Sequence, residues 1–456
     1  MLCYISQPNQ QFIELEIDPK QNAQVILDKV LKLLGILEVD YFGLQYKGPK
    51  NEDLWLNLRN RVCDHEIRTS CHVYKFSLRV KFFVPPHLVQ QECTKELFYI
   101  QAKDAMSKGL ISLAEPGCDK DTLAKIVASI TQAESGDQTN NNYQKNHYVS
   151  VIKQILPDSE ADSSLLDKIH SEHSKLRGVP RASARYFALK YASSLPGYGV
   201  EEHKAVNSVN EEIVFKVGPD GIIQQESKTK SVKMIPYTQI RLATHNERIV
   251  RIELMNDAGV TDREECYKLI SRRAAVALYR CITEMHSFYR CDTICSDVQS
   301  QYSRDFKGTF VSIFYENSDL GKRYIFDIQR TRQEAYDHVR RMLYANTNLN
   351  NVSSFQLENK NELEKEDDVE AGTSGGNQNL DQIKHLKHQL DALKDSMLCC
   401  ICMDKFVSVV LCPCGHLTCD SCSPCIDKCP QCRSSIEHLQ KMYHPFGFEC
   451  SKAQEV

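Results

Sequence analysis

Eight residues of the types that bind zinc lie within one 34-residue stretch near the C-terminus. Seven are cysteines and one is a histidine, and in chain order they are Cys399, Cys402, Cys414, His416, Cys419, Cys422, Cys429 and Cys432. Thiolates and imidazole nitrogens at these spacings are what two tetrahedral zinc ions need. A segment this short buries too little apolar area to fold alone, so metal binding must supply its folding free energy. The sequence therefore predicts a module that holds two zinc ions.

The order of these ligands separates several kinds of zinc module. A zinc ribbon has four ligands, and a nucleic-acid finger usually has two cysteines followed by two histidines. Here the histidine is fourth, Met403-Asp404-Lys405 follows the second cysteine, and Pro413-Cys414-Gly415-His416 carries the third and fourth ligands. This pattern resembles the RING fingers of ubiquitin ligases, and specifically those of the inhibitor-of-apoptosis type.

The resemblance implies that the ligands interleave along the chain. One zinc ion would be held by Cys399, Cys402, Cys419 and Cys422, and the other by Cys414, His416, Cys429 and Cys432. One alternative stays open, because Cys412 replaces Cys414 if the spacing to His416 is three residues instead of one. The motif Pro-Cys-Gly-His favours Cys414. The spare thiols Cys400, Cys412 and Cys425 are expected to be small packed side chains rather than ligands.

RING ligases form no covalent intermediate with ubiquitin, and they hold a ubiquitin-charged conjugating enzyme so that a substrate lysine attacks the thioester. The resemblance implies three contact residues for this enzyme. Ile401 would be an apolar anchor and Pro430 the opposite wall of the same groove. Arg433 would bridge the enzyme and ubiquitin, for which a fork-shaped guanidinium suits better than a lysine. The alternatives are an ordinary packing role for Ile401 and a zinc module without a ubiquitin role, and the three residues together argue against both.

Composition restricts the other functions. The chain has 456 residues, of which 42% are hydrophobic and 25% charged, as in an ordinary set of two to four globular domains. A net charge of −4 gives no electrostatic case for nucleic acid. Ten of the 20 cysteines lie in the zinc module and the others are scattered, which favours reduced thiols in a cytosolic setting. We expect neither a signal peptide nor a membrane span, and hydrolase motifs are missing.

The N-terminal part of the chain alternates between strand and helix patterns. Residues 12–17 alternate apolar and acidic side chains, which predicts a half-buried strand, and residues 23–34 follow helical spacing. Residues 74–82 alternate again, with Lys81 among the side chains of the polar face. Pro85-Pro86 ends the unit, because proline cannot continue a strand ladder. Strands and one helix in this order suit a ubiquitin-like roll.

Three segments resemble the first lobe of a FERM domain: Asp40-Tyr41-Phe42-Gly43-Leu44, Trp55-Leu56 and Val80-Lys81-Phe82-Phe83-Val84. Residues 87–195 follow helical spacing, as the helical second lobe would. A strand-rich stretch opens at Gly197-Tyr198-Gly199 and ends in a helix predicted from about 267 to 289, with Ile270 and Leu278 on its apolar face. A sheet closed by one helix is the phosphotyrosine-binding-like third lobe.

The segment between the third lobe and the zinc module has a different composition. From about residue 346 it is rich in asparagine, then acidic, then rich in glycine, which is typical of a solvated linker. A short apolar seam follows at Leu380, Ile383, Leu386, Leu390, Leu393 and Met397. Its helix either helps to pair two RING fingers or packs on its own RING finger. Ile436 and Leu439 lie behind the last ligand, and we expect them to contribute to a homodimer.

The expected architecture is a multidomain α+β chain with a three-lobed FERM domain and a two-zinc RING finger. Its expected parts are 1–84 ubiquitin-like lobe, 85–195 helical lobe, 196–345 phosphotyrosine-binding-like lobe with an extension, 346–378 linker, 379–397 helix, 398–433 RING finger and 434–456 tail.

A FERM domain followed by a RING finger resembles a family of ubiquitin ligases that degrade lipoprotein receptors. The resemblance implies receptor cytoplasmic tails of the LDL-receptor class as substrates, myosin regulatory light chain as a further partner, and a peripheral place at the inner face of the plasma membrane. A FERM third lobe can take an extended peptide as an added strand beside its last helix. The alternative function is a non-enzymatic adaptor between membrane proteins and the cytoskeleton, in which the RING finger serves only for assembly.

Overall fold

The computed structural model divides into two compact units, Met1–Gln356 and Leu357–Val456. It describes residues 1–67, 73–113, 117–137, 141–158, 162–227, 231–256, 261–315, 318–345, 399–402, 405 and 407–441. The predicted linker and the predicted helix over 379–397 lie outside these residues. In the described part of the chain, no helix has both the length and the apolar character needed to cross a membrane.

The first lobe is a five-stranded sheet with one helix, in the strand order β2-β1-β5-β3-β4. Its elements are β1 (Leu2–Ser6), β2 (Phe12–Glu16), α1 (Gln24–Leu33), β3 (Phe42–Lys47), β4 (Asp53–Trp55) and β5 (Val73–Val80). Strands β1 and β5 are parallel, and the other neighbours are antiparallel. The apolar stripe of α1 is buried in the core, because Ile26, Leu27 and Val30 recur at helical spacing. The predicted roll is confirmed.

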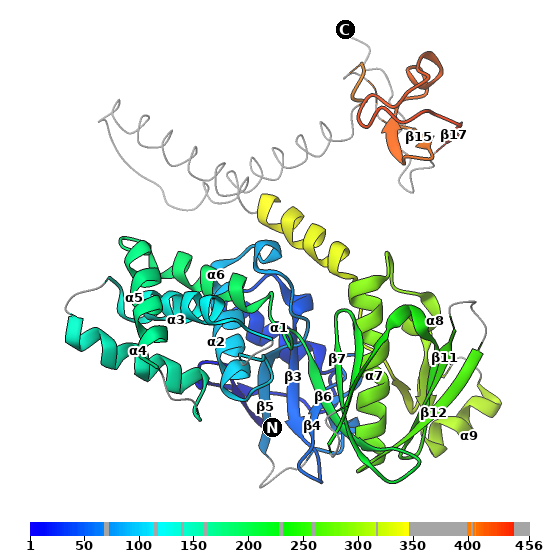
Figure 1. Ribbon diagram of the computed structural model, residues 1–456. Coiled ribbons are helices and arrows are strands. Elements are labelled where there is room, and N and C mark those ends of the chain that lie inside the picture. Colours follow the sequence, from blue (N-terminus) through cyan, green and yellow to red (C-terminus); the bar gives the residue numbers. More distant parts are fainter. Residues whose placement is uncertain are drawn as a thin grey trace, which may run out of the picture. The chain divides into compact units, whose positions relative to one another are not determined.

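The second lobe is helical, and in Figure 1 the first lobe lies between it and the third lobe. Its elements are α2 (Glu92–Ser107), α3 (Lys120–Ser135), α4 (Asn141–Ile155), α5 (Ser163–Lys175) and α6 (Arg181–Ala192). Helix α3 is the most buried of them. It begins at Asp119, whose carboxylate accepts a hydrogen bond from the backbone N–H of Thr122 at 2.7 Å. Asp162 caps α5 in the same way.

The third lobe is a seven-stranded antiparallel sheet in the order β10-β11-β12-β6-β7-β8-β9. Its strands are β6 (Glu201–Val206), β7 (Glu212–Gly218), β8 (Gly221–Glu226), β9 (Val232–Pro236), β10 (Ile240–Asn246), β11 (Ile249–Met255) and β12 (Thr261–Leu269). Helix α7 (Arg272–Arg290) packs across the sheet (Figure 1). The predicted start of this helix near 267 was wrong, because β12 continues to Leu269 and Ser271 caps the helix. Ile270 therefore precedes the helix, and its side chain is exposed.

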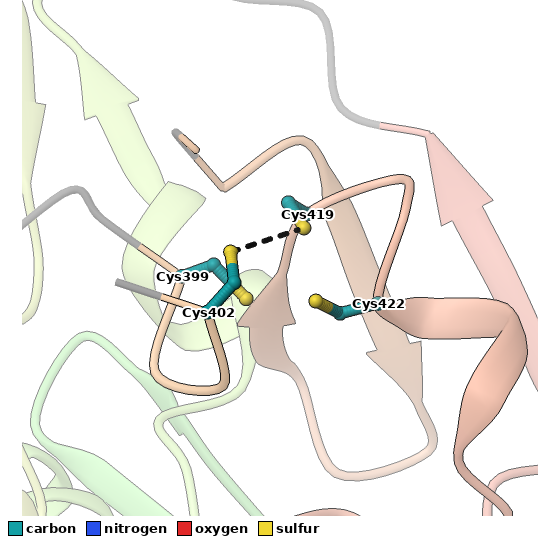
Figure 2. Close-up of side chains that lie close together, drawn as sticks. All are labelled: Cys399, Cys402, Cys419 and Cys422. Atoms are coloured by element: carbon teal, nitrogen blue, oxygen red, sulfur yellow. Dashed lines mark hydrogen bonds between the residues drawn. The ribbon is translucent and has the colours of Figure 1, made fainter. Parts of the chain in front are cut away.

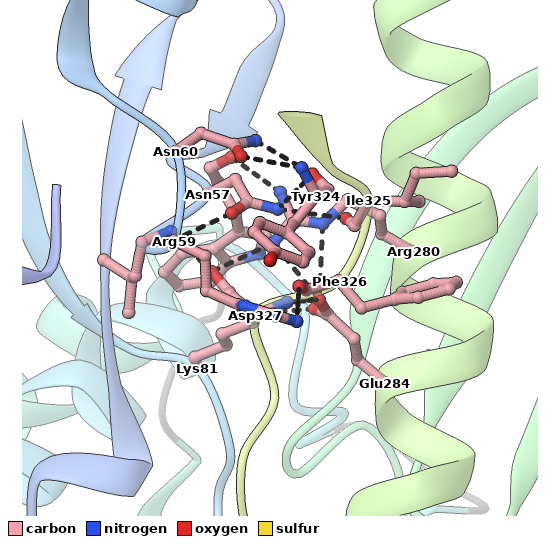
Figure 3. A network of polar contacts seen from close by, with 12 residues as sticks. Asn57, Arg59, Asn60, Lys81, Arg280, Glu284, Tyr324, Ile325, Phe326 and Asp327 are labelled. Atoms are coloured by element: carbon pink, nitrogen blue, oxygen red, sulfur yellow. Dashed lines mark hydrogen bonds and ion pairs between the residues drawn. The ribbon is translucent and has the colours of Figure 1, made fainter. Parts of the chain in front are cut away.

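The chain continues after α7 into an extension of the third lobe. Its elements are α8 (Ser296–Ser300), β13 (Tyr302–Arg304), α9 (Phe306–Phe314), β14 (Lys322–Tyr324) and a helix over residues 332–345. Strands β13 and β14 form a two-stranded antiparallel sheet of their own. The segment after β14 runs between the first lobe and α7, where it makes the polar contacts drawn in Figure 3.

A buried network of two cations and two carboxylates joins this extension to both lobes (Figure 3). The Nζ atom of Lys81 lies 2.8 Å from Asp327 Oδ1 and 2.8 Å from Glu284 Oε2. Arg280 on α7 contacts both carboxylates, and the backbone N–H of Leu58 donates to Asp327 Oδ2 at 3.0 Å. The prediction that Lys81 lies on a polar face was wrong. Its side chain is 7% exposed, because the extension covers that end of β5.

The C-terminal unit is built on a small three-stranded sheet in the order β16-β15-β17. Its elements are β15 (Val409–Cys412), β16 (His416–Thr418), β17 (His438–Lys441) and a 3-10 helix over Ser423–Cys425. A small core of Val407, Cys399 and Cys419 is buried beside this sheet. So little apolar burial agrees with a fold that depends on metal.

Candidate functional site

Four cysteines form the first cluster of possible metal ligands in the C-terminal unit. They are Cys399, Cys402, Cys419 and Cys422, and their sulfur atoms lie within 4.8 Å of one another. Figure 2 shows the four side chains turned toward a common centre, with the sulfurs of Cys402 and Cys419 3.8 Å apart. A tetrahedron of thiolates around one zinc ion has sulfur separations of this order.

The backbone prepares this cluster for binding a metal. The chain from Cys399 folds back on itself, because the N–H of Cys399 donates to the carbonyl of Lys405 at 2.8 Å. Burial opposes ionisation of the Cys399 thiol, but nearby amide N–H groups, led by that of Cys402, lower its pKa to about 6. Hydrogen bonding to Cys419 raises the pKa of Cys422 to about 12. Without metal, the cluster therefore combines a thiol that ionises readily with one that stays protonated. Zinc binding would release the remaining protons.

The second cluster contains the one histidine of the ligand set. Its members are Cys414, His416, Cys429 and Cys432, and their ligand atoms also lie within 4.8 Å of one another. The Nδ1 atom of His416 is buried without a hydrogen-bond partner among the described residues. A buried imidazole nitrogen in this state is costly unless a metal ion or another group engages it, so the residues present fit a zinc ion.

Two tight turns position this second cluster. Gly415 has a φ of +74°, in the left-handed region that suits glycine, and its N–H donates to the carbonyl of Leu411 at 2.8 Å. Arg433 has a φ of +61°, and its N–H donates to the carbonyl of Cys429 at 2.8 Å. The two clusters alternate along the sequence, as the resemblance implied. Two ions would therefore cross-link the whole unit.

The structure decides between Cys412 and Cys414. Cys414 lies in the second cluster, and Cys412 does not. Cys412 is the last residue of β15 and pairs with His438 of β17, which keeps its backbone in the sheet. Cys400 and Cys425 also lie outside both clusters, and both are exposed, so the expectation that these two are packed was wrong.

The three residues expected to contact a conjugating enzyme are all exposed. Ile401 lies in the turn between the first two ligands, and its residue is 42% exposed. Pro430 lies between the last two ligands, and Arg433 follows the last one. An isoleucine held at this exposure by a knuckle of the backbone is free to contact a partner.

One feature of the C-terminal unit was not foreseen. Strand β17 lies in the segment expected to be a tail, yet it pairs with β15, with Leu439 opposite Leu411. The sheet thus extends beyond the last ligand. Ile436 is half-buried, and Leu439 is 42% exposed. The four residues of β17 contain one apolar side chain and are all exposed, so they show none of the alternation that predicts a half-buried strand.

The first compact unit, Met1–Gln356, whose expected fold is a FERM domain and which is called the FERM unit below, contains a cavity of about 450 Å³ lined by residues of the first lobe, α7 and β14. Arg272 and Arg273 line it, and they have different partners. Arg272 lies 4.0 Å from Glu247 in the third lobe, whereas Arg273 forms an ion pair with Glu66 of the first lobe. Only the first of these two guanidiniums is well exposed.

A third group of possible ligands consists of Glu201, His203 and Cys281, of which Glu201 and Cys281 line this cavity. The Nε1 atom of Trp55 donates to Glu201 Oε2 at 2.7 Å. Burial opposes ionisation of Glu201, but His203 and Trp55 outweigh it and lower its pKa. Burial raises the pKa of Cys281 well above its usual value. We assign to this group the role of a polar link between the first and third lobes.

Comparison with protein families agrees with this division of the chain. The FERM N-terminal domain matches residues 5–67, and the FERM central domain matches residues 84–203. The C3HC4-type zinc finger, or RING finger, matches residues 395–439. The chain carries FERM domains and a RING finger.

Similar proteins share the FERM part. The chain is 27% identical over 277 residues to FERM, ARHGEF and pleckstrin domain-containing protein 1 of Gallus gallus, which covers 60% of this chain and 25% of that protein. It is 26% identical over 279 residues to Band 4.1-like protein 3 of Homo sapiens, covering 60% and 24%. The chain thus spans about a quarter of the length of these relatives.

One solved structure confirms the three-lobed fold. The FERM and C-terminal domain complex of Drosophila Merlin has a TM-score of 0.52 and 19% sequence identity. The match covers 63% of this chain and 95% of the Merlin chain. At this identity the likeness establishes the fold alone.

Proposed function

We propose that this chain is a RING-type ubiquitin ligase. The observation that carries the proposal is the pair of interleaved ligand clusters with Ile401 exposed in the first knuckle. Zinc would supply folding free energy and hold that knuckle in place. The residues of this chain would then bind a ubiquitin-charged conjugating enzyme, with Ile401 and Pro430 as the apolar contacts and Arg433 reaching both enzyme and ubiquitin. No residue of the ligase forms a bond to ubiquitin.

The test is an in vitro ubiquitination assay of the full-length protein with a panel of conjugating enzymes. At least one enzyme should give ubiquitin chains that depend on the ligase and disappear when a chelator removes zinc. A protein that contains two zinc ions and is inactive with every enzyme of the panel would contradict the proposal.

The FERM unit would select the substrate through its third lobe. Among the residues that the structure describes, strand β10 pairs only with β11 and forms an edge of the seven-stranded sheet. Helix α7 lies beside it, with the rings of His245 and Tyr279 5.0 Å apart. Leu242 on β10 is 48% exposed, so an apolar side chain accompanies the free backbone edge. An extended peptide could add here as a further strand, with its backbone bonded to β10.

The substrate class rests on the resemblance to receptor-degrading FERM–RING ligases, of which myosin regulatory light chain interacting protein, or inducible degrader of the LDL receptor, is the example. By that resemblance, the substrates would be cytoplasmic tails of lipoprotein receptors and the result their degradation. Myosin regulatory light chain would be a further partner, and the protein would act in the cytoplasm at the inner face of the plasma membrane. We also propose that the parts of such a ligase end in this chain at residues 84, 195, 345 and 433, as the sequence predicts.

The second candidate is a non-enzymatic adaptor between membrane proteins and the cytoskeleton. It is favoured by the alignment of the FERM unit with proteins such as Band 4.1-like protein 3. The two candidates differ in one readout, since an adaptor would bind its partner without transferring ubiquitin to it. The exposed Ile401 favours the ligase, because a purely structural RING finger has no need for an apolar anchor there.

A further inference from the structure

Helix α9 turns its large apolar side chains toward solvent. Phe306 is 90% exposed, Phe310 57%, Ile313 71% and Phe314 70%. Tyr315, which follows the helix, is 72% exposed. Soluble proteins rarely leave so many neighbouring large apolar side chains uncovered, and such patches commonly mark an interaction site.

The helix is turned this way by its packing face. Successive residues are about 100° apart around a helix, so Phe306, Phe310 and Ile313 share one side. Gly308 lies on the opposite side and is the only buried residue of α9. A Cβ atom at Gly308 would lie 2.2 Å from the carbonyl oxygen of Leu320, so the glycine allows the helix to approach that backbone closely. The apolar side chains therefore lie on the side of the helix away from its contact with the Leu320 backbone.

The orientation of α9 is fixed at its N-terminus. The carboxylate of Asp305 caps the helix and accepts a hydrogen bond from the N–H of Gly308 at 2.7 Å. The N–H of Asp305 in turn donates to the carbonyl of Gly321 at 3.1 Å. Through β14 the helix is tied to the first lobe, because Asn60 Nδ2 donates to the carbonyl of Tyr324 at 2.8 Å. These hydrogen bonds fix the orientation of α9, and with it the direction of the apolar face.

One basic residue lies beside the apolar face, and further basic and phenolic groups lie on the neighbouring strands β13 and β14. Lys307 is exposed on α9, one residue from Phe306. The Nζ atom of Lys322 lies 4.5 Å from the ring centre of Tyr302, and Tyr302 is 40% exposed. Asp305 caps the helix, and Asp319 and Lys322 form an ion pair with each other, which leaves Lys307 as the exposed cation of α9. Aromatic side chains with lysines beside them are the composition of protein surfaces that lie in a membrane interface.

The size of the patch argues against a second copy of the chain as its occupant. With each aromatic side chain offering roughly 150–250 Å², the face presents on the order of 500 Å², below the ~800 Å² per partner of a standard stable interface. Its four side chains Phe306, Phe310, Ile313 and Phe314 carry no polar group that would specify a protein partner. A lipid bilayer requires no complementary shape, and its anionic headgroups would complement Lys307.

We propose that α9 is a membrane-inserting element: Phe306, Phe310, Ile313 and Phe314 enter the acyl boundary of an anionic bilayer while Lys307 contacts the headgroups. A single short helix gives weak, reversible binding, so a receptor tail held at the same membrane would strengthen it. This inference does not need the ligase activity, because α9 belongs to the FERM unit.

The first experiment is flotation of the full-length protein with vesicles of phosphatidylcholine and phosphatidylserine. The double variant Phe310→Asp with Ile313→Asp should reduce the bound fraction at least about tenfold, because two charges then replace the central apolar side chains. The matched control is Leu33→Asp with Val209→Asp, whose side chains are 66% and 70% exposed elsewhere on the FERM unit. The control should bind as the unchanged protein does.

The second experiment measures how deeply the side chain at position 314 enters the bilayer. The variant Phe314→Trp should show a blue-shifted emission with vesicles and be quenched by lipids brominated on their acyl chains, after subtraction of the signal from Trp55 in the parent protein. Vesicle binding that survives in the double Asp variant and disappears only in high salt would overturn insertion in favour of headgroup attraction alone. The parent protein could instead fail to bind vesicles and form a dimer that Phe310→Asp with Ile313→Asp dissociates. This result would overturn membrane insertion and show that a second copy of the chain covers α9.

Discussion

Lys81 and Asp327 form a buried ion pair at 2.8 Å although 246 residues separate them in the chain. Lys81 belongs to the end of the first lobe, and Asp327 belongs to the extension that follows the third lobe. Glu284 and Arg280 of α7 complete the network, so that two cations face two carboxylates (Figure 3). The extension that carries α9 is therefore part of the FERM unit and not an appendage.

Asp327→Asn should destabilise the FERM unit by about 3–5 kcal/mol, because it leaves the buried cations Lys81 and Arg280 facing the single carboxylate of Glu284. The single tryptophan, Trp55, lies in this unit, so its fluorescence reports urea unfolding of the FERM part in the full-length protein. Asp319→Asn is the control, since its side chain is 87% exposed and should change stability by less than about 1 kcal/mol. Equal midpoints for the two variants would contradict a stabilising role for the network.

The same network gives the FERM unit a defined response to acid. Burial opposes ionisation of Asp327, but Lys81 and Arg280 outweigh it and hold its pKa far below its usual value. A carboxyl group with a depressed pKa stabilises the fold above its unfolded pKa of about 3.9, and the stabilisation is lost as the pH falls below that value. We expect the parent protein to lose stability below about pH 4 more steeply than Asp327→Asn does.

The sequence predicted those parts of the molecule that depend on local pattern. Ligand spacing indicated two zinc ions, the family resemblance divided their ligands into two interleaved clusters, and periodicity identified α1, β2 and β5. It failed where tertiary contacts decide. Lys81 reads as a polar residue of an alternating strand, and only the distant Asp327 and Glu284 explain its burial. The outward face of α9 was also missed, since an apolar helix reads as core unless the position of Gly308 against the Leu320 backbone is known.

Replacing Cys414 should remove one zinc ion, whereas replacing Cys412 should not. Cys414→Ser removes a thiolate from the second cluster, and Cys412→Ser changes a residue outside both clusters. Elemental analysis of the purified full-length proteins should give about two zinc ions per chain for the parent and Cys412→Ser, and about one or fewer for Cys414→Ser. The reverse result would exchange the two residues in the ligand assignment.

Ile401→Arg should abolish self-ubiquitination and leave the zinc content unchanged. A charged group in an apolar contact removes the anchor and adds a desolvation cost, and losses at such central residues commonly exceed about 2 kcal/mol. Ile249→Arg is a suitable control, because this isoleucine is 39% exposed in the FERM unit, close to the 42% of Ile401. Full activity of Ile401→Arg would show that the conjugating enzyme docks elsewhere.

We predict that the RING finger works as a dimer through Ile436 and Leu439. Leu439 projects from β17 and is 42% exposed, so this edge of the unit offers an apolar contact. Sedimentation of the full-length protein should show a dimer that Ile436→Asp with Leu439→Asp dissociates, with a loss of ligase activity. Zinc content must stay at two ions, because β17 also belongs to the sheet of the module. A fully active monomer would exclude a role for dimerisation.

A receptor tail that adds to the edge of β10 should be lost when that edge carries a charge. Leu242→Asp places a carboxylate on β10 at a residue that is 48% exposed, and it should weaken binding of lipoprotein-receptor tail peptides about tenfold or more. Met234→Asp is the matched control, because this residue is 46% exposed on β9, at the opposite edge of the same sheet. Peptides N-methylated at alternate residues should also lose affinity at one set of positions only, since an added strand bonds its neighbour through every second residue. Equal effects of both Asp variants on peptide binding would show that the peptide binds elsewhere. Tail peptides that do not bind even at millimolar concentration would exclude this substrate class. The ligase proposal would then still be supported by the RING finger alone.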